Sequence, residues 1–203
     1  MLRRVRNAVL IVVLVALLPA TNAAASAGTT WKTHRSAAGF SVSAPSTWVD
    51  ITSLTPDVIA KLSQVPSLSS YVDLVRNTKS IKLMLADVGP TAVTNRFSTN
   101  VNVIQAPTIG DLELHRQVEV AQLKATGLVV GAVRSSIVTL PAGPSLDVSY
   151  RARYSPGSRA ISILQFIFIR NGEETALTYT TLPQLQSRYR PTFLRSARTF
   201  RFR

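Results

Sequence analysis

The strongest constraint on the fold of this chain is the largely apolar segment 161–170, which leads directly into Asn171-Gly172. An Asn-Gly pair tolerates the positive φ angles of a type I′ turn, so the sequence predicts a β-hairpin over residues 161–181 with a two-residue loop. The loop length sets the register of the two strands. The predicted partners across the hairpin are Arg170 and Glu173, Phe168 and Thr175, Phe166 and Leu177, and Leu164 and Tyr179.

Both faces of the first strand of this hairpin are apolar. Phe166 and its apolar neighbours point to one face, and four isoleucines point to the other: Ile161, Ile163, Ile167 and Ile169. A strand that is apolar on both faces needs packing layers above and below its sheet. We therefore expect this strand to lie near the centre of the domain.

The first half of the chain mixes short strands with helices. Strands are predicted at 31–34, 40–44, 81–85 and 96–105 from their alternation of apolar and polar residues. Thr55-Pro56 indicates the start of a helix that has an apolar stripe of Val58, Ile59, Leu62 and Val65. A second short helix is predicted after Ser67, with Leu68, Val72 and Val75 on one face.

The second half is predicted to be a long helix, an antiparallel meander and a closing helix. The long helix follows a capping sequence at 108–111, and we expect it to pack on the sheet through Leu114, Val118, Ala121, Ala125 and Leu128. Three strands follow at 133–140, 146–154 and 161–170, with short proline- and glycine-containing connections. After Leu182 the pattern indicates a helix that Pro191 interrupts or restarts, and residues 199–202 are strand-like.

Two asparagines mark the predicted strand at 96–105 as a candidate ligand-facing surface. Asn100 and Asn102 share one face of this strand, whereas Phe97, Val101 and Val103 point the other way. Asparagine is depleted in strands, so its amides are expected to bond to something specific there. A neighbouring loop or helix end is one such partner, and a bound ligand is the other.

The order of elements resembles the PsbP-like fold. Two segments carry the resemblance, G-F-S-V-S-A-P-S-T-W at 39–48 and F-S-T-N-V-N-V-I at 97–104, and the similarity extends over about 31–202. The group includes photosystem extrinsic proteins, Ran-binding nuclear transport factors of the Mog type, and secreted bacterial proteins resembling LpqN and DcrB. The resemblance implies an α+β fold, namely a single-domain α/β/α sandwich with a mostly antiparallel sheet covered by helices on both faces. It also implies a non-enzymatic binding or accessory module, which for the bacterial relatives means one of the cell envelope.

The N-terminal segment has the pattern of a secretory signal peptide. Residues 1–6 carry three arginines and no acid, and residues 8–18 form an apolar run of 11 residues that Pro19 closes. A run of this length is too short to cross a bilayer, which takes about 20 residues. Two A-x-A sites compete, one ending at Ala25 and one at Ala27, and we expect cleavage after Ala27.

These features predict three parts: a signal peptide at 1–27, a short leader at 28–30 and one domain at 31–203. The expected location is secreted or extracytoplasmic. The chain has no cysteine, so a lipoprotein anchor, disulfides, thiolate nucleophiles and sulfur metal sites are all excluded.

Catalytic chemistry is poorly supplied by this sequence. The two histidines, His34 and His115, lie in different predicted elements, and His115 is expected to form an ordinary surface pair with Glu119. Glu173 and Glu174 flank the hairpin turn and are interpreted as solvated turn residues. None of the common metal, nucleophile or phosphate-loop motifs occurs. We therefore predict no catalytic, cofactor-binding or metal-binding residues. A cell-envelope hydrolase whose site is assembled from distant parts of the chain is the alternative.

The chain is basic, and its last segment carries much of the charge. Loss of the three signal arginines leaves 20 basic against 10 acidic residues, a net charge of +10. No acid follows Glu174, and the candidate anionic-surface contacts are Arg188, Arg190, Arg195, Arg198, Arg201 and Arg203. Such a segment favours anionic lipid, a cell-wall polymer or another envelope protein as the partner. Secretion and the shortage of interleaved aromatic residues argue against nucleic acid.

Overall fold

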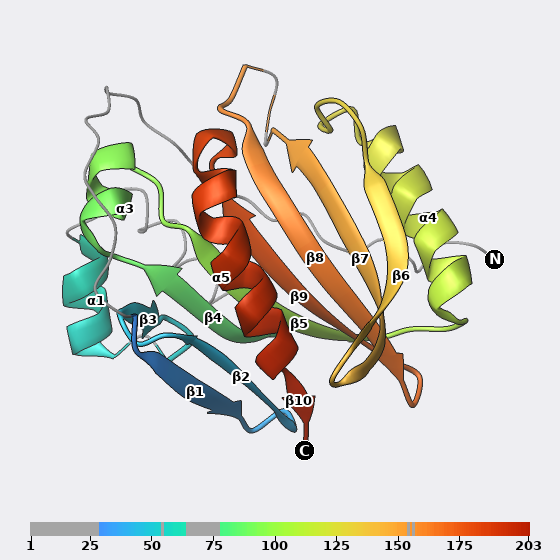
Figure 1. The fold of residues 1–203 in the computed structure, drawn as a ribbon, viewed down its shortest axis with the longest axis horizontal. Helices are drawn as coiled ribbons and strands as arrows, with labels where there is room; N and C mark the ends of the chain where they lie inside the picture. The colour runs from blue at the N-terminus through green and yellow to red at the C-terminus, as the bar shows by residue number, and fades with distance from the viewer. Residues whose placement is uncertain (1–28, 54, 64–77, 154, 156) are drawn as a thin grey trace.

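The computed structural model describes residues 29–53, 55–63, 78–153, 155 and 157–203, and in these parts the chain forms two antiparallel sheets and several helices (Figure 1). The larger sheet has seven strands in the order β3-β4-β5-β9-β8-β7-β6. They are β3 (Trp48–Asp50), β4 (Ile81–Asp87), β5 (Asn100–Pro107), β6 (Arg134–Leu140), β7 (Gly143–Ala152), β8 (Ile161–Arg170) and β9 (Glu173–Thr181). The smaller sheet joins β1 (Trp31–Ser36), β2 (Phe40–Pro45) and β10 (Arg201–Phe202). The predicted antiparallel α+β fold is therefore confirmed.

The central hairpin has the predicted register. Phe166 lies opposite Leu177 and Arg170 lies opposite Glu173. Asn171 and Gly172 adopt φ angles of 52° and 73°, as a type I′ turn requires. Strand β8 lies between β9 and β7 in the large sheet and is buried along most of its length. Two apolar layers therefore meet on either side of this strand.

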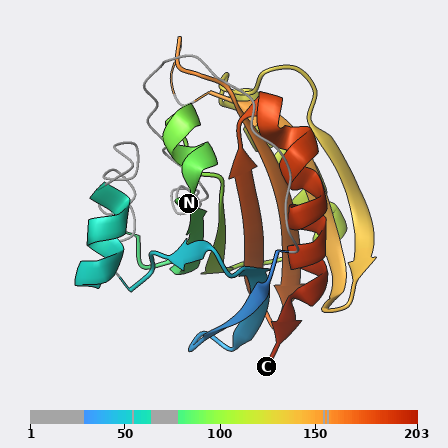
Figure 2. The ribbon, with the colours of Figure 1, turned by 60° about the vertical axis from the view of Figure 1, so that its left-hand side comes forward.

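One face of the large sheet is covered by helix α5 (Gln186–Thr199) and the small sheet (Figures 1 and 2). Phe166 and Phe168 of β8 pack there with Tyr179 of β9, and Phe193 and Phe200 of the C-terminal segment complete the aromatic layer. A short 3₁₀ helix, η2 (Pro183–Leu185), leads into α5. The C-terminal helix is thus an integral part of the core.

The opposite face carries an aliphatic layer and two further helices. Ile163 and Ile167 of β8 lie there with Val148 of β7. Helix α4 (Leu112–Ala125) contacts this layer through partly buried Leu112 and Leu123, and helix α1 (Pro56–Ser63) contributes Val58. Helices therefore lie on both faces of the sheet, as an α/β/α sandwich requires.

The long helix α4 is turned differently from the prediction. Leu114 and Val118, which were expected to face the sheet, are 49% and 42% exposed. The half-buried side instead carries Leu112, His115 and Leu123. The helix begins at Asp111, whose side chain accepts a 2.9 Å hydrogen bond from the backbone nitrogen of Leu114. The expected apolar stripe was wrong because the inner side of α4 is partly polar.

Other elements differ from the sequence interpretation near their ends. Strand β5 starts at Asn100, and helix α3 (Pro90–Asn95) precedes it, so Phe97 lies before the strand and packs in the aliphatic layer. Pro191 lies inside an unbroken α5. The signal peptide, residue 28, the helix predicted after Ser67, Val65 and Tyr154 lie outside the described residues.

Candidate functional site: the outer side of helix α5 and the adjoining groove

The outer side of α5 is defined by what its inner side buries. Tyr189, Phe193 and Ala197 recur at helical spacing and are all buried against the sheet. The arginines interleaved with them must therefore point away from the core. Arg188, Arg190, Arg195 and Arg198 of α5 are all exposed, and so are Arg201 of β10 and Arg203, which follow the helix. This set is called the α5 arginine cluster below.

Polar contacts fix α5 in place beside its apolar packing. Ser196 Oγ donates to the backbone oxygen of Ser43 at 2.7 Å, and Thr199 Oγ1 accepts from the backbone nitrogen of Ser43 at 2.8 Å. Near the other end of the helix, the Tyr189 hydroxyl donates to Asp87 Oδ2 at 2.5 Å. Burial and the adjacent Asp87 charge raise the pKa of Tyr189 well above its usual value. These bonds hold the arginines on a fixed scaffold.

No member of the α5 arginine cluster forms an ion pair with a carboxylate in the part of the chain that the structure describes. Arg195 instead lies over the Trp31 ring, 4.3 Å from its centre, and Arg188 lies 5.9 Å from the centre of the Tyr189 ring. Arg201 donates to the backbone oxygens of Arg198 and Phe200. Among the described residues the cluster therefore forms no ion pair, and Arg190 is the member whose charge acts on an acid, Asp147.

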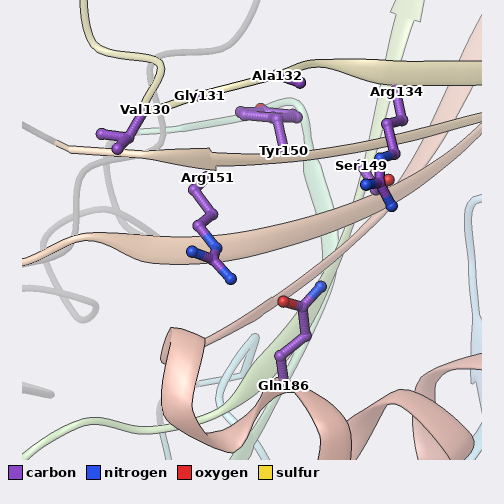
Figure 3. Close-up of a pocket in the computed structure, with 8 residues that line it drawn as sticks. All are labelled: Val130, Gly131, Ala132, Arg134, Ser149, Tyr150, Arg151 and Gln186. Atoms are coloured by element: carbon purple, nitrogen blue, oxygen red, sulfur yellow. The ribbon is translucent and has the colours of Figure 1, made fainter.

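A groove of about 250 Å³ lies beside the start of α5 (Figure 3). Its polar lining comes from Arg134 of β6, Ser149 and Arg151 of β7, and Gln186 of α5, with the segment 130–132 along one edge. Figure 3 shows the side chains of Arg134, Arg151 and Gln186 directed toward the space between β7 and α5. This groove and the α5 arginine cluster lie on the same face of the large sheet.

The strand register explains why these side chains meet. Arg134 lies opposite Ser149, and the outward positions of β7 alternate with its buried apolar residues. Arg151 lies opposite Ser162 of β8, a buried serine whose hydroxyl donates to Gln186 Oε1 at 3.3 Å. The Gln186 oxygen is therefore engaged, and its amide nitrogen is left to face the groove.

The candidate ligand-facing asparagines lie in a different place. Asn100 and Asn102 are buried on the aliphatic face of the sheet, where Asn102 lies opposite Thr178 of β9. The Asn100 side chain donates to the backbone oxygen of Ser98 at 2.9 Å. Asn102 Oδ1 has no hydrogen-bond partner among the described residues. The structure does not bring either asparagine together with the arginines, and their proposed ligand contact stays a prediction.

Both histidines pair with carboxylates instead of with each other. His115 Nε2 lies 3.0 Å from Glu174 Oε2. The ion-pair partner of His115 is therefore Glu174, and the pairing with Glu119 that helical spacing predicted was wrong. Glu174 was predicted to be a solvated turn residue, and this contact corrects that interpretation too. His34 Nδ1 lies 3.8 Å from Asp50 Oδ2, and its buried Nε2 has no hydrogen-bond partner among the described residues. Within those residues no group of three or more histidine or acidic side chains could hold a metal ion. The groove itself is lined by neither histidine nor acid.

The sequence indicated the arginines of α5 but missed the groove. Ser149 and Arg151 alternate with buried apolar residues along β7, so their outward position follows the strand periodicity. Arg134 and Gln186 carry no comparable pattern, because their positions depend on the β6–β7 register and on where α5 begins. A signal that could have indicated the groove is the polar face of β7 together with a helix that starts a short distance after the last strand of the meander, beyond η2.

The described residues thus form a seven-stranded antiparallel sheet with an apolar layer on each face, a small sheet that joins one of these layers, and a basic surface on that same side. The fold of the chain is PsbP-like. It is similar to the solution structure of cyanobacterial PsbP (CyanoP) from Synechocystis sp. PCC 6803, with a TM-score of 0.54, 9% sequence identity, and coverage of 90% of this chain and 98% of that one. It is likewise similar to the Ran-binding protein Mog1p of Saccharomyces cerevisiae, with a TM-score of 0.54, 8% identity, and coverage of 86% and 96%. At these identities the likeness shows the fold alone.

No family model and no curated protein matches the sequence. Within the described residues, no helix is both long enough and apolar enough to cross a membrane.

Proposed function

We propose that the protein is a secreted, non-enzymatic binding or accessory module of the bacterial cell envelope that contacts anionic surfaces through the α5 arginine cluster. The observation that carries this proposal is the exposure of six arginines on and just after one core helix, none of which forms an ion pair with a carboxylate among the described residues. Unpaired guanidinium groups create a local positive field that attracts anionic lipids or polymers. The PsbP-like fold supports a binding or accessory role.

The expected interaction is electrostatic, so its strength must depend on salt. Each basic residue near an anionic surface contributes about 1 kcal/mol. At physiological ionic strength the field of an exposed charge is screened beyond about 8 Å, and high salt shortens that range further. Binding through the arginine cluster should therefore be strong at low salt and weak at high salt.

Co-sedimentation with vesicles tests this proposal. The protein recovered after export is mixed with anionic phosphatidylglycerol vesicles or neutral phosphatidylcholine vesicles at low and high salt. We expect sedimentation only with anionic vesicles at low salt. Changing Arg195, Arg198 and Arg201 to glutamine should remove most of the bound fraction.

A matched variant controls for net charge. Changing Lys79, Lys82 and Lys124 to glutamine removes the same number of positive charges away from α5 and should leave binding largely intact. Equal binding by wild type and the arginine variant would contradict the proposal. An equal loss in both variants would show that total charge, and not this surface, is responsible.

Export has its own test, because it rests on the N-terminal sequence pattern. N-terminal sequencing of protein from the culture medium should find Gly28 as the first residue, which corresponds to cleavage after Ala27. A chain that still begins at Met1 and sediments with membranes would contradict the proposed location.

A further inference from the structure

We propose that the groove between β7 and the start of α5 is a binding site for a phosphate group, held by the guanidinium groups of Arg134 and Arg151. The Gln186 amide and the Ser149 hydroxyl supply neutral donors beside them. This site uses residues other than the α5 arginine cluster, so it goes beyond the proposed surface contact and does not depend on it.

The charge of the groove is the first argument. Arg134 and Arg151 form no ion pair in the part of the chain that the structure describes, and no lining residue is acidic. The nearest acid along the same face of β7 is Asp147, and Arg190 of α5 is the cation that acts on its charge. Two guanidinium groups thus face a space in which the described lining residues place no carboxylate.

The placement of the neutral donors is the second argument. Ser162 is 2% exposed and directs its hydroxyl to Gln186 Oε1, so the amide of Gln186 is oriented from behind by a buried residue. Gln186 is the first residue of α5, whose positive dipole end lies at this side of the groove. Both features favour an anion over a cation or a neutral ligand.

The geometry of the donors distinguishes phosphate from carboxylate. A carboxylate is planar and is commonly bound by one arginine through two parallel bonds. Here donors arrive from β6, β7 and α5, that is, from several directions, which suits the tetrahedral oxygens of phosphate. The volume of about 250 Å³ is below the range of about 300–1,000 Å³ typical of pockets that enclose whole ligands. The groove therefore suits a phosphate group, either free or at the end of a larger molecule.

Titrations followed by amide chemical shifts test this assignment. Inorganic phosphate, glycerol 3-phosphate and acetate are added separately to the exported protein at constant ionic strength. We expect saturable shifts at Ser149, Arg151 and Gln186 with both phosphate compounds, and at least tenfold weaker binding of acetate. Tighter binding of glycerol 3-phosphate would identify the phosphate as part of a headgroup or polymer, and equal binding would identify free phosphate as sufficient.

Two variants separate this site from the surface contact. Arg134→Gln together with Arg151→Gln should weaken phosphate binding by about tenfold or more, because each lost charge-assisted bond contributes more than about 1.4 kcal/mol. The variant of Arg195, Arg198 and Arg201 described above should bind phosphate within about twofold of wild type while losing vesicle binding. Arg151→Lys should recover only part of the affinity, since lysine keeps the charge without the planar fork.

Several results would overturn the assignment. They are shifts that do not saturate, equal affinities for acetate and phosphate, and unchanged phosphate affinity in the Arg134 and Arg151 double variant. An equal loss in the α5 variant would also overturn it, because it would show a general charge effect. Retained vesicle binding by a double variant that has lost phosphate binding would leave the proposed function intact.

Discussion

Helices α4 and α5 have the same length of 14 residues but very different relations to the sheet. α5 buries Tyr189, Phe193, Ser196 and Ala197, whereas α4 has no fully buried residue. The aromatic side chains of α5 join a continuous layer with β8 and β9. Helix length and amphipathicity therefore do not decide which helix belongs to the core. The chemistry of the inner side decides it.

Helix α4 is attached through a mixed polar and apolar contact. His115 lies 3.0 Å from Glu174, and Leu123 contributes partial apolar burial. The hydrogen bond with Glu174 raises the pKa of His115. Burial, and secondarily the charge of Glu174, raise the pKa of Glu119 on the same helix. Because α4 is held in part by this histidine–glutamate pair, whereas α5 packs mainly through apolar side chains, we expect the stability of α4 to depend more on pH near neutrality than that of α5.

The largest loss of stability is expected at the strand between the two layers. Phe166 is 1% exposed and packs edge-on against Tyr179, with ring centres 6.3 Å apart. Phe166→Ala should lower the free energy of unfolding by about 3–5 kcal/mol, which urea or guanidinium melts can measure. A loss below about 1 kcal/mol would contradict the central position of β8.

A matched pair of truncations compares the two helices directly. Phe193→Ala in α5 removes a buried ring and should cost about 3 kcal/mol. Leu123→Ala in α4 removes a partly buried side chain and should cost about 1 kcal/mol. Denaturant melts of the two variants should show this order, and the reverse order would break the comparison.

The pH response should come from α4. His115 has a raised folded-state pKa, so its stabilising charge is fully present below its ordinary pKa of about 6.5 and is lost as the pH rises through the folded value. The raised pKa of Glu119 makes stability fall with rising pH in the same way. Glu174 is the negative partner of His115. Burial, and secondarily the charge of Glu119, raise the pKa of the nearby Tyr150 hydroxyl.

His115→Gln should therefore be less stable than wild type at pH 5, by about 1 kcal/mol or less, with the difference shrinking at pH 8. Urea melts at the two pH values measure the change. An equal difference at both would show that the histidine contributes only through packing.

The smallest effect is expected on the exposed side of α4. The exposed fractions of Leu114 and Val118 are 49% and 42%. Leu114→Ala and Val118→Ala should each change the free energy of unfolding by no more than about 0.5 kcal/mol. Losses near 2 kcal/mol in thermal or denaturant melts would indicate that Leu114 and Val118 pack on the sheet, as the sequence predicted.

The sequence predicted the β8–β9 hairpin well because its information is local. Asn171-Gly172 sets the turn, the turn sets the register, and both apolar faces demand cover. The orientation of α4 could not be predicted in the same way. Leu114 and Val118 lie at helical spacing, but so do other apolar residues of α4, and Leu112 and Leu123 are the ones that contact the sheet. The side of α4 that faces the sheet also carries His115, whose partner Glu174 is distant in the sequence.

The candidate site shows the same division. The α5 arginine cluster was visible because six arginines follow Glu174 without an acid, and periodicity placed the apolar residues between them. The groove was not visible, because Arg134 and Gln186 are brought together with Arg151 only by strand register and the end of β9. Asn100 and Asn102 were singled out by residue type. Their burial depends on the residues that cover this face of the sheet, which the sequence of the strand alone does not reveal.

The arginines of the basic surface lie on, and just after, a helix that belongs to the core. Native-state amide hydrogen exchange tests it most directly, because it measures the opening free energy of each helix separately. We predict that the amides around Phe193 and Ala197 in α5 exchange only through global unfolding, together with those of β8. Amides around Val118 and Leu123 in α4 should exchange at a lower free energy, through local opening. Exchange of α5 at or below the opening free energy of α4 would contradict the account.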